Sequence, residues 1–400
     1  MRLFDCDNCH QLLFFENTRC TACGESVGYA VEAATLVSLK GGTGQASDSY
    51  EVQTPRGIQR FVKCKNFLEH DACNWLVLAS EDQPYCRSCR LTEVIPDLSE
   101  AANRTAWLEM EAAKRRLIYT LYALNLPVLT KPESSEEGLA FRFLRSTDEQ
   151  KVMTGHADGI VTLNIAEADA SFRENMREKL GEAYRTVLGH LRHESGHYYW
   201  DRIVRDSAAL EPFRKLFGDE RESYEAAVQR HYDQGPRQNW SESFISAYAT
   251  MHPWEDWAET WAHYMHMVDT LETAKSHGLA VRIPGPEAER AHVATDTLAF
   301  VDFENLMAGW HAVTIALNNL NRSMGVTDVY PFVLSPSVQD KLRFVHELIW
   351  ERPAPSVGRN AHLLEASARP SAGAASARDT ASRDTASRDT KGPASARVRS

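Results

Sequence analysis

The sequence predicts an α+β protein in which small cysteine-rich modules precede a larger, mainly helical domain and a disordered tail. All eight cysteines lie between positions 6 and 89. Apolar residues recur at helical spacing through much of the chain from 99 to 352. The remainder repeats Ala-Ser-Arg-Asp-Thr with almost no large apolar side chain, so it cannot offset the entropy of ordering. The expected segments are therefore 1–30, 31–98, 99–352 and 353–400.

Composition and charge exclude several classes of protein. The 400 residues are 43% hydrophobic, which suits a globular protein with more than one folding unit. The net charge is -11, and the first hundred residues carry 9 Lys/Arg against 14 Asp/Glu, which disfavours binding to nucleic acid or anionic lipid. No apolar run reaches the roughly 18 to 20 residues that span a membrane. The charged start lacks the apolar region of a signal peptide, so a cytoplasmic protein is expected.

Two sets of four cysteines are expected to hold metal ions. The first follows the pattern of a four-cysteine zinc ribbon, two C-x-x-C pairs ten residues apart: Cys6, Cys9, Cys20 and Cys23. About thirty residues cannot otherwise build a stable core. The second set is less regular and leaves His70 open as a replacement for one of its first two members: Cys64, Cys73, Cys86 and Cys89. Four protein ligands occupy all coordination positions of a tetrahedral zinc ion, so both sites are expected to be structural.

The segment from 99 to 352 is expected to consist mainly of helices. A first helix begins near Ser99 and continues to Leu124, because apolar residues recur there at helical spacing and Pro127 follows. Residues 159–165 are expected to form a strand. A long helix is expected from about Ala170 to Val204. Further helices are expected near 208–217, 220–231, 241–251, 254–276, 295–324 and 335–350.

The predicted long helix contains the sequence His-Glu-x-x-His, with His193, Glu194 and His197. Residues four apart share a helix face, so both imidazoles can bind one zinc ion. Glu194 can reach a water on that ion, act as general base, and pass the proton to a leaving amine. Ser195 and Gly196 are small and allow close packing around the motif. We therefore expect a catalytic zinc site here rather than a solvated helix with two ordinary histidines.

A third ligand is needed, because a catalytic zinc ion keeps three protein ligands and one water. Trp200 and Ile203 stand where the metzincin extension of the motif has Gly and His, which excludes that class. The best candidates lie downstream, where Glu255 and Glu259 are four apart and share a helix face. Two carboxylates beside apolar residues are costly to bury without a cation.

The motif at 193–197, followed by Glu-x-x-Ala-Glu at 255–259, resembles the gluzincins, and among them the lethal-factor-like type. Together with the cysteine-rich start, it resembles the bacterial zinc-binding metallopeptidases over most of residues 1–350. The resemblance implies a zincin-like peptidase fold with one catalytic zinc ion and one or two structural ones. It also implies that Glu255 is the third ligand, that Glu259 supports a zinc-bound histidine, and that Tyr248 stabilises the tetrahedral oxyanion.

Several residues have alternative interpretations. Asp256 is an alternative third ligand, although it lies about 100° around the helix. Tyr248 can equally just pack. Asp201, one turn after the motif, can orient a ligand or be an ordinary solvated residue. His263 and His266 are interpreted as core or surface histidines.

The leading prediction is a zinc-dependent peptidase that acts on peptides or proteins. Residues 160–165 form either the edge strand that holds an extended peptide or an element of the core. One alternative is a protease for nucleic-acid-bound proteins, like the SprT-like group, but that group places its ribbon after the catalytic domain. Another is a non-catalytic protein whose ribbons bind a protein partner. Glu194 disfavours this non-catalytic alternative, because a structural metal site needs no acid or base.

Overall fold

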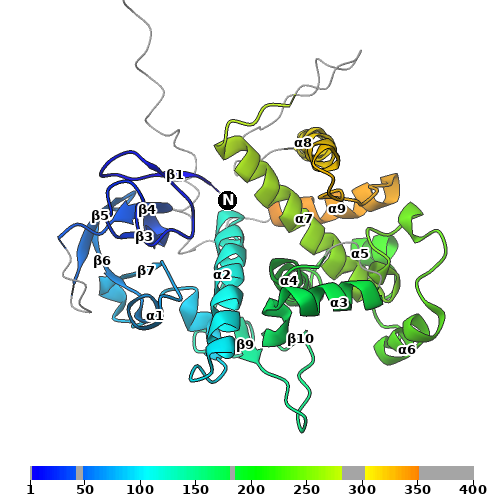
Figure 1. Ribbon diagram of the computed structural model, residues 1–400. Helices are drawn as coiled ribbons and strands as arrows, with labels where there is room; N and C mark the ends of the chain where they lie inside the picture. The colour runs from blue at the N-terminus through cyan, green and yellow to red at the C-terminus, as the bar shows by residue number, and fades with distance from the viewer. Residues whose placement is uncertain (1, 42–47, 181–184, 282–301, 351–400) are drawn as a thin grey trace, which may run out of the picture. The chain divides into compact units, whose positions relative to one another are not determined.

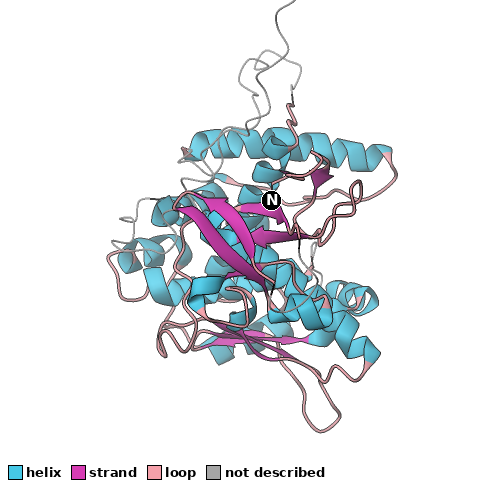
Figure 2. Ribbon diagram, turned by 90° about the vertical axis from the view of Figure 1, so that its left-hand side faces the viewer, coloured by secondary structure: helices cyan, strands magenta, loops and turns pink. Residues whose placement is uncertain are grey.

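The computed structural model describes residues 2–41, 48–180, 185–281 and 302–350 (Figure 1). All of them fall in one structural unit. The fold is α+β, as predicted, with several small sheets beside many helices (Figure 2). In chain order, a zinc-ribbon region that holds most of the small sheets is followed by a mainly helical region. The segment 353–400, predicted to be disordered, lies outside the described residues.

Short antiparallel strands build the N-terminal part of the chain. They form two two-stranded sheets, β1–β2 and β3–β4, and a three-stranded sheet in the order β5-β6-β7. Side chains of β5 alternate between buried and exposed, so this strand covers a small core on one face, whereas β3 is buried along its whole length. The strands and the one α-helix of this part are β1 Phe4–Asp5, β2 Leu12–Leu13, β3 Val27–Ala30, β4 Thr35–Ser38, β5 Tyr50–Thr54, β6 Gly57–Lys63, α1 Lys65–His70 and β7 Leu76–Leu78.

A four-stranded sheet of order β10-β11-β9-β8 accompanies the helices. Its strands are β8 Thr92–Val94, β9 Ala140–Leu144, β10 Gly155–Ala157 and β11 Ile160–Asn164. The predicted strand at 159–165 is present as β11, but it lies inside the sheet between β9 and β10. Of the two interpretations left open, the edge strand is therefore excluded and the core element is observed, and β10 forms that edge.

Eight helices follow α1 within the described residues: α2 Ala101–Ala123, α3 Ala170–Leu180, α4 Val187–Ile203, α5 Leu210–Phe217, α6 Tyr224–Gln234, α7 Pro253–Ser276, α8 Phe303–Ser323 and α9 Pro336–Trp350. The helix α4 packs along α7, and α2 packs against α4. Large buried side chains fill the spaces between these helices, among them Trp107, Trp257, Trp261 and Trp310.

The single helix predicted from Ala170 to Val204 is wrong, because the structure contains α3 and α4 instead. The second helix starts after Thr186, whose backbone is extended and whose side chain accepts a hydrogen bond from the Gly189 amide. A threonine in this position caps a helix and marks its first turn. Residues 181–184, which the prediction included, lie outside the described residues.

The helix predicted at 241–251 is also wrong. Only two short 3₁₀ turns occur there, Trp240–Glu242 and Tyr248–Thr250. Ser246 accepts a hydrogen bond from the Ala249 amide at 3.1 Å, and such local side-chain bonds compete with helical ones. The helix predicted at 295–324 is observed as α8, and its expected residues 295–301 lie outside the described part.

The helix α2 connects the cysteine-rich region to the helical region. Arg115 donates a hydrogen bond to the carbonyl oxygen of Ala72, and Tyr119 lies edge-on to Phe15 with ring centroids 5.1 Å apart. The next residue, Thr120, donates to Asp269 of α7 at 2.5 Å. The same helix therefore contacts both regions.

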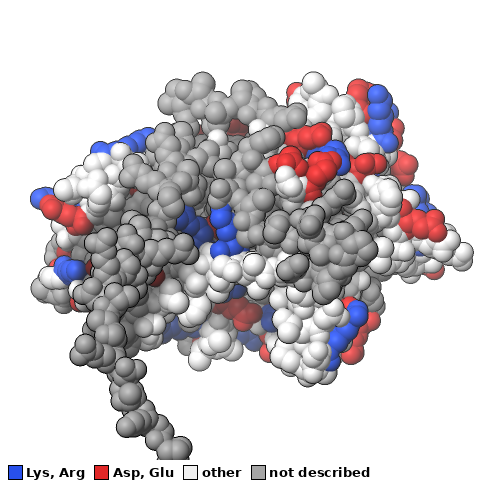
Figure 3. All heavy atoms as spheres, turned by 90° about the horizontal axis from the view of Figure 1, so that it is seen from above, with Lys and Arg blue, Asp and Glu red and all other residues white. Residues whose placement is uncertain are grey.

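Charged side chains of both signs are interspersed on the coloured part of the face drawn in Figure 3. This agrees with an excess of only eleven negative charges over 400 residues. None of the helices within the described ranges is both long and apolar enough to cross a lipid bilayer.

Candidate metal centre

The centre forms where α4 and α7 are in close contact. A methyl group on Gly196 would lie 3.0 Å from the Cα atom of Ala258, so a larger residue there would push the two helices a few tenths of an ångström apart. Two indole groups of α7 then bind α4. Trp257 donates to the Gly196 carbonyl oxygen at 2.8 Å, and Trp261 donates to the Ser195 hydroxyl at 3.1 Å. The expectation of close packing at the two small residues is confirmed.

Three predicted side chains converge across this contact. The Nε2 atoms of His193 and His197 are 3.2 Å apart. The Glu255 carboxylate has Oε2 at 3.0 Å from His193 Nε2 and Oε1 at 3.5 Å from His197 Nε2. A tetrahedral zinc ion with bonds of about 2.0–2.2 Å places its ligand atoms about 3.3–3.6 Å apart. The two imidazole nitrogens and the carboxylate group, through one oxygen or the other, therefore lie within a few tenths of an ångström of the spacing of such a site.

The electrostatics of the centre also favour a cation. Burial raises the pKa of Glu255, but His197 and His193 hold it well below its usual value. Burial lowers the pKa of His193, but Glu255 and Glu259 hold it well above the usual value. One carboxylate and two imidazoles that lie close together in a buried site are a donor set that zinc binds.

Glu259 binds the outer nitrogen of His193. Its Oε1 atom accepts from Nδ1 of His193 at 2.7 Å, and its Oε2 atom accepts from the Ser246 hydroxyl at 2.6 Å. A proton on Nδ1 leaves the lone pair of Nε2 directed at the centre. Carboxylates commonly orient metal-binding histidines in this way.

Glu194 lies beside the two histidines and is buried. One of its carboxylate oxygens has no hydrogen-bond partner among the described residues. Burial raises its pKa, while His193 and His197 oppose that rise. A carboxylate with a raised pKa accepts a proton more readily near neutral pH.

Aromatic residues surround the centre. The Trp254 ring lies 4.0 Å from the His197 ring, and the Tyr248 ring lies 5.9 Å from the His193 ring. His156, on the edge strand β10, stacks with His197 at 6.3 Å. Tyr224 of α6 donates to Oε1 of Glu255 at 2.8 Å. The sequence did not point to Tyr224 or His156, because neither has a fixed spacing from the motif.

The alternative residues lie elsewhere. Asp256 faces α9, where it accepts a hydrogen bond from Lys341 at 2.6 Å, and it does not join the converging donors. Asp201 pairs with Arg205 at 2.9 Å. His263 is buried against Tyr330, with 2.8 Å from its Nδ1 to the tyrosine oxygen, and His266 packs on the same ring.

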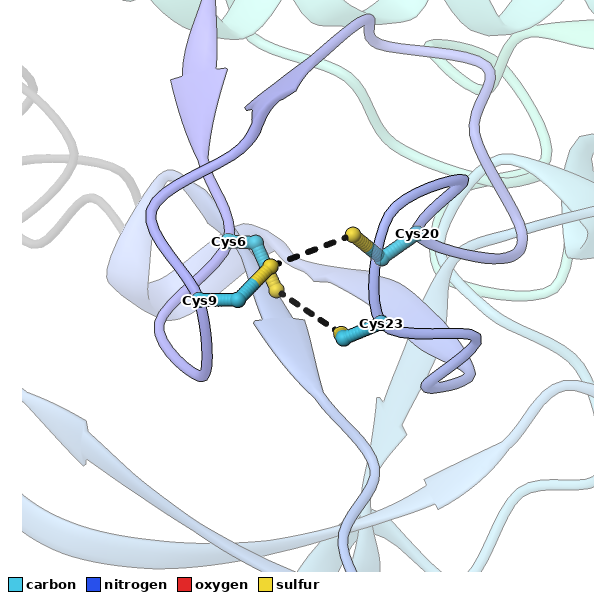
Figure 4. Close-up of side chains that lie close together, drawn as sticks. All are labelled: Cys6, Cys9, Cys20 and Cys23. Carbon is cyan, nitrogen blue, oxygen red and sulfur yellow. Dashed lines mark hydrogen bonds between the residues drawn. The ribbon is translucent and has the colours of Figure 1, made fainter.

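The first cysteine set is brought together from two turns, with Cys6 and Cys9 between β1 and β2 and Cys20 and Cys23 between β2 and β3 (Figure 4). The sulfurs of Cys6 and Cys23 are 3.8 Å apart, and those of Cys9 and Cys20 are 3.6 Å apart. Zinc–sulfur bonds of about 2.3 Å in a tetrahedron place the sulfurs about 3.8 Å apart. The spacing therefore fits one tetrahedral zinc ion.

The second cysteine set is fully buried. Its four members are Cys64, Cys73, Cys86 and Cys89. The sulfurs of Cys73 and Cys86 are 3.7 Å apart, and the Trp75 amide donates to the Cys73 sulfur at 3.3 Å. His70 does not replace a cysteine, since it packs edge-on against Trp107. The donor set again fits a zinc ion with no open position.

Comparisons with known proteins cover most of the chain. A zinc-ribbon domain model matches residues 3–100. One protein from Mycobacterium bovis and two from Mycobacterium tuberculosis, each called only uncharacterized, are 41% identical over 352 residues, or 88% of this chain and 96% of each relative. No solved structure matches significantly. A further family model matches residues 103–348, and on this match the chain belongs to the family described as “putative zinc-binding metallo-peptidase”.

Proposed function

We propose that this chain is a zinc-dependent peptidase whose catalytic zinc ion is held by His193, His197 and Glu255. The observation that supports it most strongly is the convergence of two imidazoles and one carboxylate: the Nε2 atoms of His193 and His197 are 3.2 Å apart, and Glu255 has Oε2 at 3.0 Å from the first and Oε1 at 3.5 Å from the second. Three protein ligands leave one position for water, which is the arrangement of catalytic rather than structural zinc.

Zinc bound there supplies Lewis acidity, which lowers the pKa of a water molecule to about 7 and polarises a peptide carbonyl group. Glu194 takes the proton of the attacking water and delivers it to the leaving amine. Its burial supports this role, because a desolvated carboxylate is a stronger base. Glu259 keeps His193 in the tautomer that offers Nε2 to the centre.

Tyr248 is the proposed donor to the oxygen that gains charge during attack. It is partly buried beside His193, and desolvation holds its pKa well above the usual value, which keeps the hydroxyl protonated as a donor. Hydrogen-bond donors aimed at a developing oxyanion lower the barrier of acyl transfer.

An extended peptide is the proposed substrate, bound along β10. This strand lies at the edge of its sheet and contacts the motif helix α4. The unpaired backbone groups of an edge strand can hydrogen bond to a peptide in extended form. His156 on that strand lies next to His197, so a peptide bound there would pass the centre.

The two cysteine sets are proposed to hold structural zinc, which gives three zinc ions in all. Their four sulfur donors leave no position for water. A docking role for a protein partner is compatible with the first set, because Cys9 and Cys23 are exposed.

The test is a comparison of Glu194→Gln with Glu211→Gln, a matched change at an exposed glutamate of α5. Zinc content is measured by mass spectrometry, and cleavage is profiled on a peptide library at pH 7. We expect E194Q to keep its zinc and to lose at least about 100-fold in kcat/KM, as is usual for a general base, whereas E211Q stays active. Full activity of E194Q would overturn the mechanism. Three zinc ions in His193→Ala would overturn the ligand assignment.

A further inference from the structure

Tyr224, the first residue of α6, contacts one oxygen of the proposed carboxylate ligand. Its hydroxyl donates to Oε1 of Glu255 at 2.8 Å. The other oxygen, Oε2, lies 3.0 Å from Nε2 of His193. Oε1 also lies 3.5 Å from Nε2 of His197, so the tyrosine contacts the oxygen nearer His197 and leaves Oε2 to His193.

The chain before α6 is tied to the start of α7, which carries Glu255. His252 caps α7 by accepting a hydrogen bond from the Trp254 amide at its Nδ1 atom, 3.1 Å away. The proton of this ring is therefore on Nε2, which donates to the Glu222 carbonyl oxygen at 3.1 Å. This bond holds the backbone two residues before Tyr224 against α7.

The Tyr224 ring itself packs against α7. Its centroid lies 5.4 Å from the His252 ring and 6.2 Å from the Trp254 ring, both edge-on. The ring is thus held by two aromatic contacts and the hydroxyl by Glu255, although the residue is 42% exposed.

We infer that Tyr224 is a positioning residue, which holds Oε1 of Glu255 so that Oε2 remains available to the metal. This inference rests on the ligand set of the proposed function. Partners that hydrogen bond to a ligating carboxylate fix its orientation, and their loss typically costs about 10–100-fold in metal affinity. Tyr224 therefore sets the affinity of the centre for zinc.

The experiment measures zinc content of the full chain after equilibration at graded concentrations of free zinc. Tyr224→Phe removes one hydroxyl and keeps the ring. Tyr232→Phe is the matched control, because Tyr232 lies on the same helix and is 68% exposed. Glu255→Ala gives the zinc content that the cysteine sets hold without the centre, and retention of that zinc in every variant reports an intact fold.

We expect Y224F to need about 10–100-fold more free zinc to half-fill the centre, while Y232F fills like the parent chain. An unchanged zinc dependence in Y224F would overturn the inference. Loss of peptide cleavage with unchanged zinc dependence would also overturn it, since the hydroxyl would then act on substrate. A shifted zinc dependence in a chain that cleaves no peptide would support the inference and reject the proposed function. Equal zinc content in Glu255→Ala and the parent would overturn both.

Discussion

The substitution Gly196→Ala places a methyl group where α4 and α7 are in contact. Its carbon would lie 3.0 Å from the Ala258 Cα atom and 3.2 Å from two atoms of Trp261. Neither neighbour can move easily. Ala258 presents backbone, and Trp261 is fully buried with its indole nitrogen bound to Ser195. The two helices must therefore separate by a few tenths of an ångström.

Two effects of opposite sign set the size of the change. Overpacking a dense core costs about 1–3 kcal/mol. Alanine inside a helix is about 1 kcal/mol more favourable than glycine. The expected loss of stability is therefore about 0–2 kcal/mol. Gly309→Ala on α8 is the control, because its nearest new contact is an ordinary 3.6 Å to Leu271. This substitution should therefore show only the higher helix propensity of alanine, without a cost of overpacking.

The assay is urea unfolding of both variants, followed by circular dichroism at a single fixed concentration of free zinc. Zinc must be fixed because a bound ligand stabilises the folded state. With equal slopes, the free energies of unfolding should differ by about 1–3 kcal/mol, with G309A the more stable. An unfolding midpoint of G196A at or above that of G309A would refute the reasoning. Zinc bound at limiting concentration should also fall in G196A alone, because His193 and His197 flank the site.

Other expected outcomes concern residues away from the centre. Lys341→Met should destabilise the chain by about 3 kcal/mol in urea unfolding, because it leaves the buried Asp256 carboxylate unpaired, and the added change Asp256→Asn should restore part of that loss. This loss of stability should be larger at pH 8 than at pH 6. Burial raises the pKa of Asp256 to about 7 in the folded chain, above its unfolded value. The buried carboxyl group is therefore neutral at low pH, where it needs no partner, and becomes charged as the pH rises through 7, where the missing lysine is felt. Thr186→Ala should cost about 0.5–2 kcal/mol by removing the cap of α4, whereas Thr186→Ser should stay near the parent value. Cys73→Ser should lower the zinc content by one ion and lower the Tm measured from helical dichroism, because Arg115 of α2 binds the backbone next to this cysteine; an unchanged Tm would mean that α2 does not depend on that site.

Much of the candidate centre could be predicted because its parts are local in sequence. Residues four apart share a helix face, which places His193 with His197 and Glu255 with Glu259 on their respective helices. Paired C-x-x-C spacings likewise predict that four sulfurs meet. That the two motif helices lie together could be predicted only from the resemblance to a known family. Glu255 follows His197 by 58 positions, and no helical or strand periodicity relates residues so far apart.

The remaining features depend on contacts that helical periodicity does not encode. The break before α4 depends on the Thr186 cap, and the loss of helix at 241–251 depends on Ser246, whose hydroxyl also binds Glu259. The position of the strand at 159–165 inside its sheet depends on β10, a three-residue strand too short to recognise by alternation. Tyr224 comes from a helix that no motif marks.

The position of α2 has a consequence for how such a chain responds to its surroundings. Arg115 binds the backbone beside the second cysteine set, and Thr120, five residues on, binds the Asp269 carboxylate that also pairs with Arg192 of the motif helix. We expect metal starvation, or oxidation of the buried thiols, to break the contact of Arg115 first and so to weaken the contacts of α2 with α7 and the motif helix. Under the proposed function, activity would then follow the zinc and redox supply of the cell, although the proposed catalytic ligands His193, His197 and Glu255 include no cysteine.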